Sequence, residues 1–72
     1  MTTTELQARA AWRIVTGHRA LARLNRKLAR TYQAAGCECL ADPARRVAHI
    51  EADRAAKAML ALRVFRAIGE VA

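Results

Sequence analysis

Apolar residues recur every three or four positions along the first half of the chain, which is the spacing of one face of an α-helix. This face consists of Leu6, Ala10, Ile14, Gly17, Leu21, Leu24, Leu28, Tyr32 and Ala35. The pattern predicts a helix over about residues 4–35. Two capping boxes are available at its start, Thr2 with Glu5 and Thr4 with Gln7.

A second helix is predicted over about residues 43–71, again from helical spacing. Its face consists of Val47, Ile50, Arg54, Ala58, Ala61, Phe65, Ile68 and Ala72. Between the two helices, Gly36 suits the left-handed residue that follows a helix end. Asp42 and Pro43 suit an N-cap and a first helical position, where the missing N–H of proline costs nothing. We therefore predict a turn over residues 36–42.

Two long helices joined by a short turn predict an all-α antiparallel hairpin, with one domain over residues 1–72. The expected neighbours are Tyr32 and Val47, Leu28 and Ile50, Gly17 and Ala61, and Ala10 and Ile68. Gly17 destabilises a helix interior by about 1 kcal/mol relative to alanine. The apolar residues around it leave no room for a loop, so we expect a continuous helix in which Gly17 allows the second helix to approach closely.

Residues 58–65 are apolar on nearly every side of the predicted helix, interrupted only by Arg63. Such a helix is buried on more than one side, and one neighbouring helix cannot cover it. We therefore predict a homodimer in which two hairpins form a four-helix bundle. Its predicted core is Met59, Leu60, Leu62, Val64 and Phe65. Arg54 either pairs with an acidic residue across this interface, Glu51 or Asp53, or lies beyond the end of a narrow apolar seam.

The chain is short and strongly basic. Its 72 residues suffice for one small core, and its net charge is +7 with a pI near 11.1. This charge favours an anionic partner: nucleic acid, an acidic protein surface or anionic lipid. No stretch approaches the roughly 18 apolar residues of a membrane span, and the first residues lack the features of a signal peptide. We expect a cytoplasmic protein with reduced thiols.

A basic face on the first predicted helix is the main functional signal. It consists of Arg9, Trp12, Arg13, Arg19, Arg23, Arg26, Lys27 and Arg30. Cations along one side of a rod can follow a phosphate backbone, and an aromatic ring among them can stack on a base. The alternative interpretation is a solvated surface on which arginine side chains cover alanines.

Other chemistry has little support in the sequence. Cys37 and Cys39 form a lone C-x-C pair, a weak metal signal even with His49 added, and we interpret them as turn residues. His18 and His49 are interpreted as packing or surface residues. The chain has no serine and no glycine-rich phosphate loop. We therefore expect no enzyme activity, no cofactor and no metal.

The predicted hairpin, with its expected pairing into a bundle, resembles Rop-type helical hairpins, which form four-helix bundles and bind RNA. The resemblance lies in the architecture, which does not carry function. Two functions remain open. One is contact with a nucleic-acid backbone through the first helix. The other is a protein-interaction module, such as a small phage- or plasmid-type inhibitor that docks on an acidic host protein.

Overall fold

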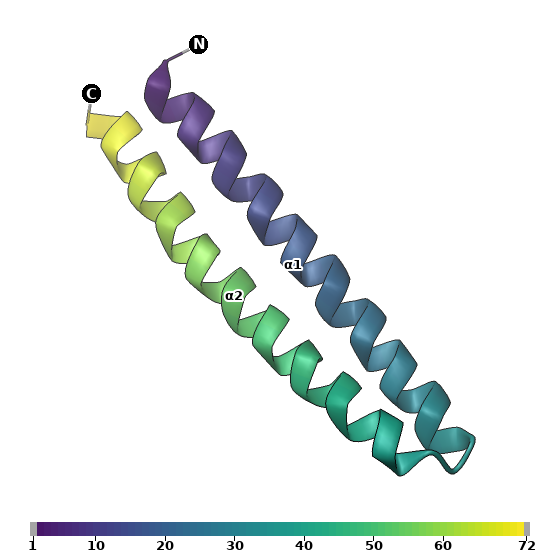
Figure 1. Ribbon diagram of the computed structural model, residues 1–72. Coiled ribbons are helices and arrows are strands. Elements are labelled where there is room, and N and C mark those ends of the chain that lie inside the picture. The colour runs from purple at the N-terminus through teal and green to yellow at the C-terminus, as the bar shows by residue number, and fades with distance from the viewer. Residues whose placement is uncertain (1, 72) are drawn as a thin grey trace.

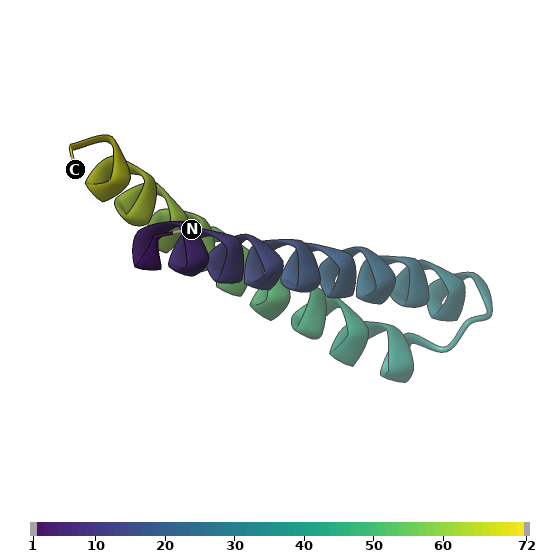
Figure 2. The same cartoon turned by 90° about the horizontal axis from the view of Figure 1, so that it is seen from above.

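The computed structural model describes residues 2–71, with side-chain environments for residues 2–70. Two helices, α1 (Thr3–Ala34) and α2 (Glu38–Val71), lie side by side and antiparallel (Figure 1). They are slightly inclined to one another (Figure 2) and form a rod of 55 × 16 × 11 Å. The predicted all-α hairpin is confirmed. Neither described helix combines the length and the apolar character that crossing a membrane requires.

The start of α1 is fixed by one of the two predicted capping boxes. The Thr2 hydroxyl accepts a hydrogen bond from the Glu5 N–H at 3.1 Å, and the Glu5 carboxylate accepts one from the Thr2 N–H at 3.3 Å. These bonds satisfy amide groups that have no partner inside the helix. The helix then continues through Gly17 without interruption, as expected.

The end of α1 is a Schellman motif. Gly36 has a φ of 77°, and its N–H donates to the Gln33 carbonyl at 3.0 Å. The Cys37 N–H donates to the Tyr32 carbonyl at 2.8 Å. These two bonds occupy carbonyls that the helix leaves free, and they reverse the chain within three residues. The predicted role of Gly36 is confirmed.

The predicted start of α2 at Pro43 is wrong. The Cys37 carbonyl accepts hydrogen bonds from the amides of Leu40 and Ala41, so the helix begins at Glu38 and Pro43 is its sixth residue. Proline costs the helix one hydrogen bond there, but it lies on an exposed side and near the N-terminal end. Asp42 therefore does not cap the helix. Its carboxylate binds the Arg45 guanidinium instead.

Alanines form most of the contact between the helices. The buried apolar residues are Ala11, Val15, Ala22 and Ala29 of α1 and Ala41, Ala44, Ala48, Ala55 and Leu62 of α2. In each helix they follow steps of three, four or seven residues, which keeps them on one stripe. Short alanine side chains let the two helix axes approach closely. Among residues 2–70, only Leu62 and Val15 are both large and fully buried.

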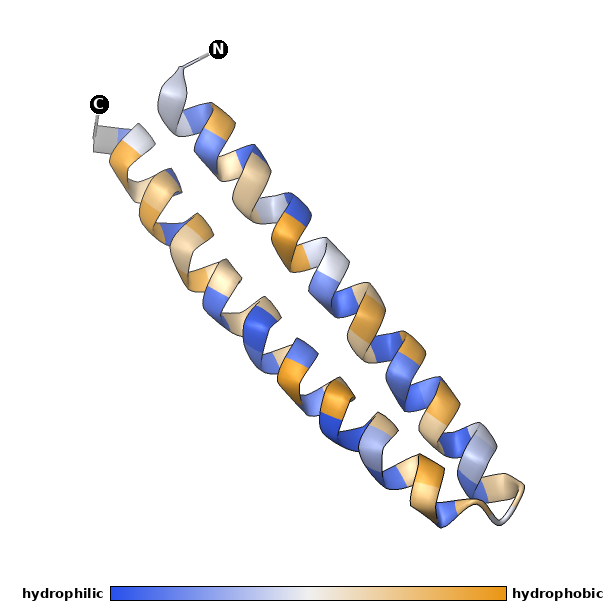
Figure 3. Ribbon diagram, viewed as in Figure 1, coloured by the Kyte–Doolittle hydropathy of each residue, from blue (hydrophilic) through white to orange (hydrophobic). Residues whose placement is uncertain are grey.

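The predicted apolar seams are not the contact between α1 and α2. Large members of both seams, such as Ile14, Leu24 and Ile50, are about half exposed. A Cβ atom added to Gly17 would meet nothing within 4 Å, so the predicted close approach of Ala61 is wrong. Figure 3 shows hydrophobic residues along the whole of both helices, well beyond the alanine contact. Ala72, the last residue of the second predicted seam, lies outside the described residues.

Candidate functional site

The buried stripes divide the surface of the hairpin into two sides. Along α1, Trp12, Arg19 and Arg26 recur every seven residues on one flank of its stripe, and Ile14, Leu21 and Leu28 recur on the other. The position of each flank relative to α2 follows from shared pockets. Arg19 lines a pocket together with Ala56 and Arg63, which follow the buried Ala55 and Leu62 of α2. The arginine flank of α1 therefore lies on the same side of the hairpin as Ala56 and Arg63.

Arginines from both helices line a shallow groove along this side, which we call the basic groove. They are Arg9, Arg13, Arg19, Arg23, Arg26 and Arg30 of α1 and Arg45, Arg63 and Arg66 of α2. The floor is apolar and consists of Ala8, Ala22, Ala29, Ala52, Ala55, Ala56, Met59, Leu60 and Leu62. Three of the pockets are linked through Arg19 or Arg26, and the fourth adjoins them through Trp12, which lies beside Arg19, so the groove extends along most of the hairpin.

Most of these arginines have no acidic neighbour. Within residues 2–70, the basic side chains that form ion pairs are His18, Arg45, Arg54 and Lys57, and Arg45 is the groove residue among them. The Arg19 guanidinium lies 5.8 Å from the centre of the Trp12 ring, within cation–π range. Trp12 is 42% exposed and remains accessible beside the groove. The groove therefore combines an excess of positive charge with one accessible aromatic ring.

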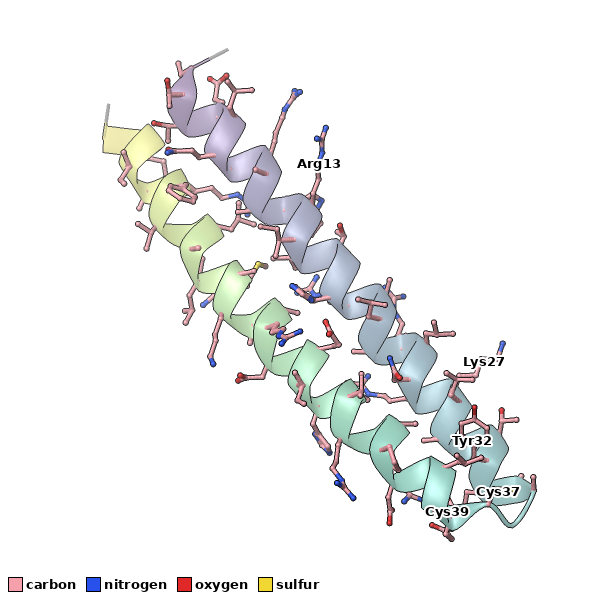
Figure 4. All side chains as sticks on the ribbon, in the orientation of Figure 1. Arg13, Lys27, Tyr32, Cys37 and Cys39 are labelled. Carbon is pink, nitrogen blue, oxygen red and sulfur yellow. The ribbon has the colours of Figure 1, made fainter. Side chains whose placement is uncertain are left out.

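The structure brings together most of the predicted basic face. Figure 4 shows Arg13 and Lys27 extending from α1 on the side away from α2. Arg13 still borders the groove beside Trp12, whereas Lys27 is not among the lining residues. The contribution of α2 to the groove was not predicted from the sequence. The seven-residue repeat of Ala41, Ala48, Ala55 and Leu62 was the signal that could have placed Arg63 on this side.

The opposite side of the hairpin is an apolar face. It consists of Ile14, Leu21, Leu24 and Leu28 of α1 and Val47, Ile50, Val64 and Ile68 of α2, each at least 36% exposed. Ala10, Gly17 and Ala61 lie among them by helical spacing. Most of this face is made of the two predicted seams. The two seams were predicted to pack against each other between the helices. Instead they lie side by side on the surface of the hairpin and face outward. Lys57 lies at the edge and pairs with Asp53 at 2.9 Å.

A polar centre interrupts the apolar face. It consists of His18 of α1 and Glu51 and Arg54 of α2. Glu51 is only 7% exposed, and its two carboxylate oxygens bind different partners: one the His18 Nδ1, the other the Arg54 guanidinium at 3.2 Å. His18 stands between Ile14 and Leu21 on the helix surface. Arg54 pairs with Glu51, as considered from the sequence, but within its own chain.

The five residues predicted as a dimer core do not lie together. Leu62 is 1% exposed and belongs to the hairpin's own core, while Met59 and Phe65 are half-buried. Leu60 lines the basic groove, and Val64 lies on the apolar face. This segment is apolar on nearly every side because its residues contribute to three different parts of the hairpin: its core, the basic groove and the apolar face.

The cysteines and histidines do not converge. Cys37 is half-buried in the turn and Cys39 is exposed, and neither forms a disulfide. In the described part of the chain, no three His, Cys, Asp or Glu side chains are grouped in a way that could hold a metal ion. His49 is exposed on the basic-groove side of α2, and His18 belongs to the polar centre.

No protein-family model, curated protein or solved structure matches this chain.

Proposed function

We propose that the protein binds nucleic acid, with the basic groove contacting the phosphate backbone. The observation that carries this proposal is the collection of arginines from both helices on one side, most of them without an acidic neighbour. From Arg9 to Arg30 the helix rises about 31 Å, at about 1.5 Å per residue. Several phosphates of one strand fit along that length. Trp12 adds a surface on which a base can stack.

Binding is tested with labelled mixed-sequence oligonucleotides, single-stranded and duplex, of DNA and of RNA. Fluorescence anisotropy over a salt series gives the slope of log K against log salt, which reports the number of phosphate contacts. The double variant Arg19→Gln/Arg26→Gln removes two groove cations. We expect weaker binding and a slope smaller by about 1.4–1.8, because each contact contributes about 0.7 to 0.9.

A matched control removes the same charge elsewhere. Lys27 and Arg46 are exposed and are not among the groove-lining residues. Lys27→Gln/Arg46→Gln should therefore retain most of the affinity and the slope. Equal losses in the two double variants would show that net charge alone drives binding, and no measurable binding by the native chain would contradict the proposal.

A second candidate function is supported by the apolar floor of the same groove. Alanines, Met59 and Leu60 between rows of arginines suit an amphipathic helix with acidic edges. This favours docking on an acidic host protein, as a small phage- or plasmid-type inhibitor does. A pull-down with and without nuclease separates the two functions, because a protein partner is retained after nuclease treatment.

We further propose that the protein is a homodimer joined through the apolar face. The hairpin exposes 5331 Å², whereas a compact monomer of 7.9 kDa exposes about 4,400 Å². The excess of about 900 Å² is close to the roughly 800 Å² that each partner buries in a stable interface. A second copy supplies an apolar face of the same kind and extent, and two such faces form a four-helix bundle.

A further inference from the structure

The polar centre lies halfway along the hairpin. The midpoint of α1 (Thr3–Ala34) falls between residues 18 and 19, and that of α2 (Glu38–Val71) between residues 54 and 55. His18 and Arg54 therefore stand at the midpoints of their helices, with Glu51 one turn from Arg54. The centre is about equally far from the turn and from the open end of the hairpin.

The two halves of the apolar face differ in bulk. The half nearer the turn carries Leu21, Leu24 and Leu28 of α1, with Val47 and Ile50 of α2. The half nearer the open end carries Ile14, Val64 and Ile68, but also Ala10, Gly17 and Ala61. The small residues of the open half leave room that the leucines of the turn half can fill.

Two copies can pair through this face in two ways. With both turns at the same end, α1 lies on α2 of the partner and residues at the same height of the hairpin oppose each other, so Leu28 opposes the partner's Val47 and Leu24 opposes the partner's Ile50. The large residues of the turn half then meet each other, whereas the small residues of the open half leave it less filled, so the two halves of the interface are packed unequally. With the turns at opposite ends, α1 lies on α1 of the partner and α2 on α2. Leu28 then opposes the region of the partner's Ala10, so a large side chain of one copy faces a small residue of the other.

Resting on the proposed dimer, we propose that the two copies pair with their turns at opposite ends and with both His18–Glu51–Arg54 centres on the two-fold axis. In this pairing a residue that lies a given distance from the axis along one hairpin lies the same distance on the other side of the axis in the partner. When the two hairpins overlap along their full length, their polar centres therefore meet only if each centre lies at the midpoint of its hairpin. A pairing shifted by about two turns would place Arg54 against Val47 or Ala61 of the partner subunit's α2, which is unfavourable for a charged group. The centre thereby sets the register.

The native cysteines report the orientation. With the turns at opposite ends, the Cys37 and Cys39 thiols of the two copies are separated by nearly the 55 Å length of the hairpin. A short bis-maleimide should then give no covalent dimer from a sample that sediments as a dimer. A covalent dimer in high yield would overturn the proposed orientation. A sample that sediments as a monomer would instead overturn the dimer itself, and the inference with it.

Engineered cysteines report the register. In a Cys37→Ser/Cys39→Ser background, Gly17→Cys lies beside the proposed axis and should form an intermolecular disulfide on mild oxidation. Leu28→Cys, the matched control on the same face, lies far from the axis and should not. A disulfide from Leu28→Cys with none from Gly17→Cys would contradict the proposed axis.

The role of the polar centre is tested by making it apolar. His18→Leu/Glu51→Leu/Arg54→Leu in the same backgrounds should leave a dimer by sedimentation but remove the selection of register. The yield from Gly17→Cys should fall severalfold. An unchanged pattern in a dimeric variant would show that packing of the apolar side chains alone sets the register.

Discussion

Gly36 shows how a single residue determines the topology of this chain. Its backbone lies in the left-handed region, at a φ of 77°, and nothing lies within 4 Å of the place where a Cβ would stand. The constraint at this position is therefore conformational rather than steric packing against a neighbour. The two hydrogen bonds of the Schellman motif depend on this conformation, and through them so does the reversal between α1 and α2.

Gly36→Ala should therefore destabilise the protein by about 1–2 kcal/mol, the strain of an L-residue in this region. At this chain length the melting temperature falls by roughly 4–8 °C for each kcal/mol. Gly36→Asn is the matched control and should lose less stability than Gly36→Ala, because asparagine tolerates the left-handed conformation. Urea unfolding followed by circular dichroism, at one protein concentration, measures both. Equal losses would indicate that the backbone conformation of residue 36 is not the constraint.

At the scale of the helices, the contact is built from alanine and the larger apolar residues face outward. Helix spacing alone correctly predicted two helices, the hairpin, the Thr2–Glu5 cap as one of two alternatives, and the role of Gly36. It did not identify the contacting faces, because the predicted seams were traced through large apolar residues such as Leu21 and Leu24. Both the alanine stripe and the leucine stripe of α1 have helical spacing. Which one faces α2 depends on packing between helices, which a single-helix pattern does not contain.

For the basic groove and the polar centre, likewise, only the features that lie within one helix could be predicted from the sequence. The cations of α1 could be grouped from their spacing, since they lie on a single helix. Arg63 and Arg66 join them only because α2 places its own flank beside that of α1. The polar centre depends likewise on a contact between residues 33 positions apart, His18 and Glu51. Local spacing contains no information about such a pair.

Close approach of the helices at the alanine stripe gives a direct prediction. Ala22 is 3% exposed between the helices, so Ala22→Leu should force them apart and destabilise the protein by about 1–3 kcal/mol. Ala20→Leu is the matched control, because Ala20 is exposed on the same helix and two residues away. Its effect should remain within about 0.5 kcal/mol. A similar cost for both substitutions, in urea unfolding, would mean that the alanine stripe is not the packed contact.

At the scale of the whole molecule, the hairpin separates charge and apolar surface onto opposite sides. The basic groove needs contact with solvent or an anionic partner, whereas the apolar face is better buried. Because the two surfaces point in opposite directions, a dimer joined through the apolar faces leaves both grooves accessible. Self-association and binding to a polyanion are then compatible, and each can be changed by substitutions that leave the other surface intact.

The proposed dimer should be sensitive to charge on one side of the hairpin and tolerant of it on the other. Leu21→Glu places a carboxylate in the middle of the apolar face, where burial of an unpaired charge is unfavourable. Leu60→Glu, the matched control, places the same charge at an exposed leucine that lines the basic groove. By sedimentation equilibrium at micromolar concentration, we expect twice the 7.9 kDa chain mass for the native protein and Leu60→Glu.

Leu21→Glu should sediment as the single chain under the same conditions. It should also lose helical circular dichroism at a lower urea concentration than the native protein, because the small alanine core is then the remaining source of stability. Equal dissociation by Leu60→Glu would place the interface on the groove side instead. A native protein that sediments as a single chain throughout the micromolar range would show that the apolar face is not covered by a second copy.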